Sequence, residues 1–129
     1  MSRSLDDLDP EFYPVACQLI ARACEVKIPV LIVDTLRTFA EHQENLRRRV
    51  SSTANSKHLP QPPHGKSLAI DVCPYEEYQL HGPDKLQWND ADPAWQVLGA
   101  IGESLGLRWG GRWARPHDLG HFEYVRPDP

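Results

Sequence analysis

The sequence predicts an α+β fold in which a small antiparallel sheet packs against helices. Two apolar, β-branched runs of strand length lie at residues 29–35 and 67–72. Two more strand-like segments, 107–113 and 121–125, are separated by a short turn, which favours antiparallel pairing. One helical pattern precedes the first of these strands, a second lies between the two apolar runs, and a third precedes the C-terminal strand pair. This order of elements suggests the α+β class.

The first helix is expected over residues 9–26. Asp9 is a suitable N-cap and Pro10 suits the first turn, where a missing N–H costs nothing. Apolar residues then recur at helical spacing and define one buried face. These residues are Val15, Leu19, Ile20 and Ala23.

The second helix is expected over residues 38–50, after the first strand. Thr38 and Glu41 form a capping-box pattern, in which each side chain accepts a hydrogen bond from the other residue's backbone. The helical period predicts an inward face made of Phe39, His42 or Gln43, and Leu46. The basic run at 46–50 is read as a solvated helix end.

The third helix is expected over residues 92–106, before the C-terminal strands. Asp92 caps it, Pro93 opens it, and Gly106 ends it. The apolar residues at helical spacing predict one buried face. They are Trp95, Leu98, Ile101 and Leu105.

The composition is that of an ordinary globular protein. The chain has 129 residues, of which 40% are hydrophobic and 25% charged, a size that suits one domain over residues 1–129. The formal net charge of −4 disfavours a nucleic-acid partner, because such proteins usually carry a basic surface. No run approaches the roughly 18 apolar residues of a transmembrane helix, and the acidic N-terminus does not resemble a signal peptide.

Chemistry-bearing residues cluster around a long loop at 51–66 and near the C-terminus. Loops longer than about 12 residues in a compact domain are usually functional or disordered. The candidates for metal binding are His58 or His64, Asp71, and His117 or His121. Asp71 stands in an apolar strand, where a carboxylate is costly unless it is paired or bound to a metal. Three such ligands with one open position are typical of a catalytic zinc site.

Asp118 precedes His121 by three residues. If His121 holds a metal from the start of a strand, Asp118 lies in the preceding turn, close to the metal's open position. A carboxylate in that place can act as a general base toward the attacking water. Asp is also an ordinary turn residue, so the hypothesis depends on the whole combination.

Two segments together resemble a known family. "SKHL" with "SLAIDVCPY", followed by "WGGRW" and "DLGHFEYV", resemble the zinc peptidases of the D-alanyl-D-alanine carboxypeptidase and L-alanyl-D-glutamate endopeptidase group, especially phage endolysins. The resemblance extends from about Pro29 to Val125. It implies the hedgehog/DD-peptidase fold.

The resemblance also assigns roles to individual residues. It implies that His58, Asp71 and His121 bind Zn²⁺ and that Asp118 is the general base. Arg37, in "TLRTFAEHQ", would stabilise the developing oxyanion or bind a substrate carboxylate. Trp109 and Trp113 are open to two readings, as walls of the cleft or as core residues.

The first histidine ligand is open to two assignments. In the family, histidine and aspartate usually stand seven residues apart, which is the spacing of His64 and Asp71. Around His64, however, Pro62 replaces the usual serine and Ser67 the usual glycine. His58 has the expected "SKHL" context, and a proline-rich insertion would explain its wider spacing, since a longer loop costs little free energy. We favour His58.

The implied activity is hydrolysis of peptidoglycan stem peptides, as an L-Ala-D-Glu endopeptidase or a D,D-carboxypeptidase. We expect a monomeric phage endolysin without a separate wall-binding domain. It would be made in the cytoplasm of the bacterial host and reach the cell wall without its own signal peptide, by holin-type release. The alternative is a non-catalytic, zinc-stabilised binding domain of the same fold.

Overall fold

The computed structural model describes residues 2–48, 56–75, 86–114 and 117–127. The predicted helix end at 49–50, the loop residues 51–55 and the excursion at 76–85 lie outside these ranges. The elements in chain order are η1 (Leu5–Asp7), α1 (Tyr13–Glu25), β1 (Val30–Asp34), α2 (Phe39–Arg47), β2 (Ala69–Pro74), α3 (Ala94–Ser104), β3 (Arg108–Trp109), η2 (Gly110–Arg112) and β4 (His121–Glu123).

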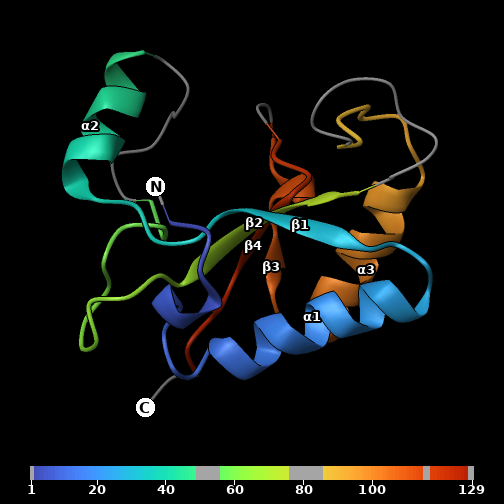
Figure 1. The fold of residues 1–129 in the computed structure, drawn as a ribbon, viewed down its shortest axis with the longest axis horizontal. Coiled ribbons are helices and arrows are strands. Elements are labelled where there is room, and N and C mark those ends of the chain that lie inside the picture. Colours follow the sequence, from blue (N-terminus) through green and yellow to red (C-terminus); the bar gives the residue numbers. More distant parts are fainter. Residues whose placement is uncertain (1, 49–55, 76–85, 115–116, 128–129) are drawn as a thin grey trace.

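The strands form one antiparallel sheet in the order β1-β2-β4-β3 (Figure 1). Helices α1 and α3 contact each other and cover the sheet, whereas α2 stands apart from it (Figure 1). The α+β prediction is therefore confirmed. The register aligns Asp34 of β1, Asp71 of β2 and His121 of β4 across three adjacent strands. Polar residues distant in the sequence thus share one row of the sheet.

The hydrophobic core lies between the sheet and the helices α1 and α3. Gly99 and Gly102 let α3 approach the sheet closely, because a Cβ at either position would lie within 2.6 Å of an aromatic carbon of Trp109 or Phe122. The buried apolar side chains include Phe12, Leu19, Ile70, Val72, Trp95, Leu98 and Phe122. This packing holds β2 and β4 rigidly beside each other, and the candidate site is built on these two strands.

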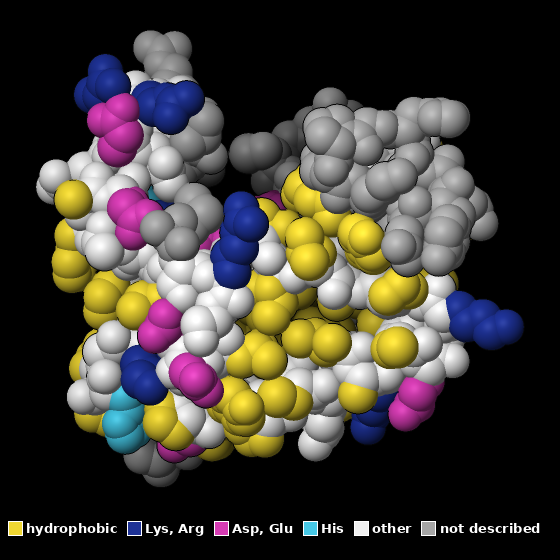
Figure 2. Space-filling view, viewed as in Figure 1, with side chains coloured by type: hydrophobic (Ala, Val, Ile, Leu, Met, Phe, Trp, Pro, Cys, Tyr) yellow, Lys and Arg dark blue, Asp and Glu magenta, His cyan; other side chains and the backbone are white. Residues whose placement is uncertain are grey.

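The sheet edge at β1 is less covered. Figure 2 shows hydrophobic side chains gathered over the part of the surface where α1 and β1 lie. Leu31 in β1 and Tyr13 in α1 are among the large hydrophobic residues that are exposed. Among the strands that the structure describes, β1 pairs with β2 alone and forms one edge of the sheet.

The predicted start of the first helix was wrong. Helix α1 begins at Tyr13, with Pro14 in its first turn, and not next to Asp9. Asp9 is buried and accepts hydrogen bonds from the Glu11 backbone N–H at 3.0 Å and from Arg126 at 2.9 Å. Its side chain therefore holds the preceding turn and ties it to the C-terminal segment, because a buried carboxylate needs such partners.

The capping box of α2 is confirmed, and the burial of Phe39 is not. Thr38 Oγ1 accepts from the Glu41 N–H at 3.1 Å, and Glu41 accepts from the Thr38 N–H at 3.0 Å. Phe39 is 62% exposed, whereas His42 is buried. Since α2 stands away from the sheet, only a narrow face of it meets the protein.

The third helix follows the prediction, whereas the strand expected at 107–113 was wrong in its extent: β3 covers Arg108–Trp109, and Gly110–Arg112 form the 3-10 helix η2. Asp92 Oδ1 accepts from the Ala94 N–H at 2.9 Å, and Gly106 adopts a φ of 85° just after the helix, a conformation that suits glycine at a helix end. In the part of the chain that the structure describes, no helix is both long and apolar enough to span a membrane.

Candidate metal centre

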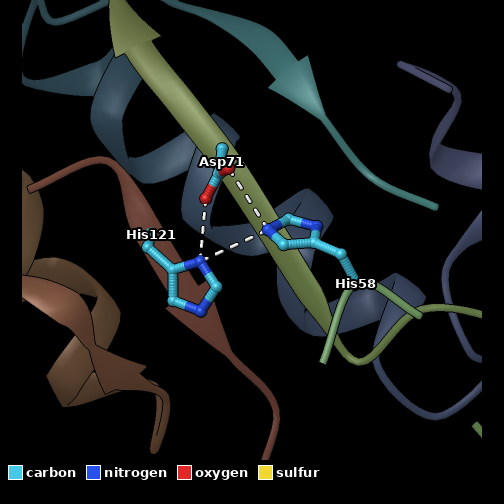
Figure 3. A group of neighbouring side chains, drawn as sticks. All are labelled: His58, Asp71 and His121. Carbon is cyan, nitrogen blue, oxygen red and sulfur yellow. Dashed lines mark hydrogen bonds and ion pairs between the residues drawn. The ribbon is translucent and has the colours of Figure 1, made fainter. Parts of the chain in front are cut away.

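Asp71 and His121 meet because they are cross-strand partners. They face each other in the β2–β4 register, and paired residues on adjacent strands project from the same face of a sheet. His121 Nδ1 lies 2.8 Å from Asp71 Oδ1 (Figure 3). The side chains of Ile70 and Phe122, one residue along each strand, are buried in the core, so both strands keep the polar pair on the opposite face.

His58 comes to the same place from a loop. Two neighbouring segments hold its backbone: the Arg37 N–H donates to the His58 carbonyl at 2.9 Å, and the Leu68 N–H donates to the Lys57 carbonyl at 3.0 Å. His58 Nε2 then lies 3.2 Å from Asp71 Oδ2 (Figure 3). His58 is therefore a buried residue that is fixed at both its backbone and its ring.

His58 and His64, the two candidates for the first histidine ligand, lie in different environments. Between them the chain turns back on itself, with the Gln61 N–H donating to the Lys66 carbonyl at 3.0 Å and the Gly65 N–H to the Gln61 carbonyl at 2.8 Å. This closed turn brings the chain from His58 to the start of β2 despite the long spacing. His64 lies on the turn and is exposed, whereas His58 lies with Asp71 and His121. Whether His58 binds metal stays a prediction.

The three residues offer ligand atoms that all lie within 4.8 Å of one another. His58 Nδ1 faces the Thr35 carbonyl at 2.6 Å, and His121 Nε2 faces Glu123 Oε1 at 2.9 Å. An oxygen acceptor needs an N–H, so in each neutral ring the nitrogen that faces the acceptor carries the proton. The other nitrogens, His58 Nε2 and His121 Nδ1, lie 3.3 Å apart and carry lone pairs. Two lone pairs and a carboxylate aimed at one point suit a cation. The donor set of two imidazoles and one carboxylate fits zinc.

Hydrogen bonds within the cluster shift the pKa values of His121 and Asp71 in opposite directions. Burial alone would lower the pKa of His121, but its hydrogen bonds to Asp71 and Glu123 raise that pKa to about 10. Burial alone would raise the pKa of Asp71, but hydrogen bonds from His121 and His58 hold it below its ordinary value. Carboxylates on both sides of the ring thus favour positive charge on His121.

Asp118 lies in the turn that leads into β4. Its carbonyl accepts from the His121 N–H at 3.3 Å, and its own N–H donates to the Gly110 carbonyl at 3.0 Å. Although the residue is exposed, the protein around its carboxylate raises the pKa of Asp118, chiefly by desolvation and further by the negative charge of Asp71. Asp118 therefore lies at the border of the cluster, where water can reach it.

The Arg37 side chain is more buried than expected of a residue that contacts substrate. Its side chain is 11% exposed and binds Asp34 Oδ2 at 2.6 Å and His42 Nδ1 at 3.2 Å. The same Asp34 oxygen lies 3.9 Å from His58 Nδ1. Arg37 thus compensates a buried carboxylate behind His58. Its predicted contact with substrate stays a prediction.

Two tryptophans and His117, which the sequence singled out, lie in different environments. Trp109 is a core residue, whereas Trp113 is 37% exposed, with its ring centroid 4.9 Å from that of His121. His117 is exposed and lies 3.8 Å from Asp90.

Glu123 is a residue that the sequence analysis missed, and it binds His121. The signal was present, because residues two apart on a strand share a face.

The model of the D-alanyl-D-alanine carboxypeptidase family matches residues 51–124, more than half of the chain. The chain belongs to this family. The matched segment contains His58, Asp71, Asp118 and His121. Membership in this peptidase family confirms the resemblance that the two sequence segments carry.

A solved structure extends the likeness of this family member over nearly its whole length. The chain is similar to the crystal structure of the Serratia marcescens L-Ala D-Glu endopeptidase ChiX, with a TM-score of 0.68 and 21% identity over 96% of this chain and 87% of that chain. At this identity the likeness concerns the fold, and it supports the α+β class. No curated protein matches the chain significantly.

Proposed function

We propose that the protein is a zinc-dependent peptidase that cleaves peptidoglycan stem peptides. The convergence of His58, Asp71 and His121, with their ligand atoms within 4.8 Å of one another, is the observation that carries the proposal. Membership in the carboxypeptidase family and the fold shared with an L-Ala D-Glu endopeptidase support the substrate class.

In this proposal the three residues hold the metal and Asp118 handles the proton. Zinc bound there would supply Lewis-acid chemistry to the scissile carbonyl and to the attacking water. Asp118 would accept the proton of that water and donate it to the leaving amine. Its raised pKa favours this role, because a base with a pKa closer to the working pH also returns the proton more readily.

We propose two candidates for the bond that is cleaved. The fold of the endopeptidase ChiX supports the bond between L-Ala and D-Glu, and the family description supports the terminal D-Ala-D-Ala bond. Mass spectrometry of fragments released from purified peptidoglycan distinguishes them, since the two bonds leave different termini. We propose, from the sequence motifs, that the enzyme serves as a phage endolysin.

The test uses metal removal and reloading. We expect the metal-free protein to release no fragments and one equivalent of Zn²⁺ per chain to restore release. Fragment release by a verified metal-free preparation would refute the zinc requirement. A zinc-loaded protein that binds peptidoglycan without cleaving it would instead support the non-catalytic binding domain.

A further inference from the structure

The outer nitrogen of His121 has a partner of its own. Nε2 lies 2.9 Å from Glu123 Oε1, on the side of the ring away from Asp71. The Glu123 side chain is only 12% exposed. A partly buried carboxylate at this distance from an imidazole makes a directional, charge-assisted hydrogen bond, which holds the ring more firmly than a solvent contact does.

The geometry of β4 produces this contact. His121 and Glu123 are two residues apart on one strand and therefore project from the same face. The cross-strand partner of Glu123 on β2 is Ala69, whose small side chain leaves room for the glutamate to lean toward the imidazole. On its other side, Glu123 Oε2 lies 3.8 Å from Arg108 of β3.

The two histidines are oriented by different kinds of acceptor. His58 presents Nε2 to Asp71, and its Nδ1 faces the backbone carbonyl of Thr35 at 2.6 Å. His121 presents Nδ1 to Asp71, and its Nε2 faces the Glu123 carboxylate. The acceptor at His58 belongs to the backbone. The acceptor at His121 is a side chain, so its contribution can be measured by substitution.

We propose that Glu123 is a positioning residue that fixes His121 as the Nε2–H tautomer and directs its Nδ1 lone pair into the metal site. The inference rests on the proposed zinc site and adds a determinant of its affinity. A carboxylate behind a ligating imidazole also makes the ligand nitrogen more basic. Glu123 acts through His121, whose Nε2 lies 2.9 Å from its carboxylate, and is not one of the three proposed ligands.

The first test measures zinc affinity by competition with a chromophoric chelator at fixed pH. Glu123→Ala is expected to weaken Zn²⁺ binding about 10- to 100-fold, the usual effect of losing such a partner. Glu123→Gln keeps a hydrogen-bond acceptor without the charge and should fall between Ala and wild type. Wild-type affinity in both variants would overturn the proposal.

A matched control separates positioning from general damage. Glu103→Ala removes a glutamate of α3 that pairs with an arginine, Arg112, at 2.9 Å and is not among the residues of the cluster. It should leave zinc affinity unchanged. Arg108→Ala removes the ion pair on the other oxygen of Glu123 and should cost less affinity than Glu123→Ala. If Arg108→Ala weakened zinc binding as much, the effect would belong to the β3–β4 pairing, and the proposal would fail.

The second test observes the tautomer directly. Long-range ¹H–¹⁵N NMR of the histidine rings in the zinc-loaded wild type should show the proton of His121 on Nε2, and the hydrogen-bonded shift of that proton should be lost in Glu123→Ala. A proton on Nδ1 would overturn the inference. If Glu123→Ala did not fold, Glu123→Gln would decide, because equal affinity to wild type would refute the role of the charge. A wild type that binds no zinc would refute the proposed function, whereas zinc binding unaffected by Glu123 would refute only this inference.

Discussion

His58 and His64 lie six residues apart, yet the structure gives them opposite environments. His58 is buried against Asp71, and His64 is exposed on the turn closed by Gln61 and Lys66. We expect His58→Ala to lose zinc and activity, because a ligand is removed, and His64→Ala to keep both. Metal content by mass spectrometry checks the pair. Zinc lost only from the His64 variant would show that the seven-residue spacing identifies the ligand.

A substitution of Asp118 separates metal binding from proton transfer. Asp118→Asn keeps the side-chain shape but cannot accept a proton, so turnover should fall on the order of a hundredfold to ten-thousandfold while zinc content is unchanged. Kinetics and metal analysis on the same preparation check this. Parallel loss of zinc and activity would make Asp118 a ligand or a structural residue.

The pH profile of the wild type adds a second readout of Asp118. The general base must be ionised, and the pKa of Asp118 is raised above its ordinary value of 3.8. The acid limb of activity therefore lies at a higher pH than an unperturbed aspartate would give, and activity falls as pH falls through it.

At the scale of elements, the turn between β3 and β4 depends on Gly110. A Cβ at this position would lie 2.4 Å from the Asp118 carbonyl oxygen and 3.0 Å from the His121 Cβ. Gly110→Ala must therefore displace the backbone that carries both residues, at a cost of about 1–3 kcal/mol. We expect a large loss of activity and a comparatively small drop in melting temperature.

The matched control for that substitution is Gly65→Ala. Gly65 lies on the exposed turn with a φ of 67°, and among the described residues no atom lies within 4 Å of its missing Cβ. The added methyl strains only the local backbone, so stability should drop slightly and zinc binding should persist. Normal activity of the Gly110 variant, compared in the same assay, would show that the turn can shift without moving Asp118.

At the scale of the whole molecule, the cluster couples stability to pH in the metal-free protein. His121 has a folded pKa of about 10 against an ordinary 6.5, so between these values the folded state holds more protons than the unfolded state. Its stabilisation is complete below about pH 6.5 and is lost as pH rises toward 10. Asp71, with a lowered pKa, acts in the opposite direction: its stabilisation is complete above its ordinary 3.8 and is lost as pH falls below that value.

The metal-free melting temperature should therefore fall by several degrees from about pH 6 to about pH 9.5. Zinc replaces the proton on His121, so the zinc-loaded protein should lose less stability over this window, and zinc affinity should rise with pH. Thermal unfolding with and without Zn²⁺ measures both. His121→Gln is the control and should flatten the metal-free profile. An equally flat wild-type profile would contradict the coupling.

The sequence by itself determined the features that depend on neighbouring residues. The Thr38–Glu41 capping box and the end of α3 at Gly106 are local hydrogen-bond and backbone preferences, and both are readable within a few positions. The α+β class followed from the order of the helical and strand-like apolar patterns along the chain. The spacing of Asp118 and His121 likewise needs only a turn and a strand.

Only the tertiary structure decided which residues at a distance meet. The closed turn at 61–66 brings His58 to Asp71 and leaves His64 in solvent, and Arg37 binds Asp34 because that carboxylate is buried beside it. Phe39 is exposed because α2 stands away from the sheet. Burial and partner choice depend on contacts between segments far apart in the chain, and local patterns carry no information on how those segments pack.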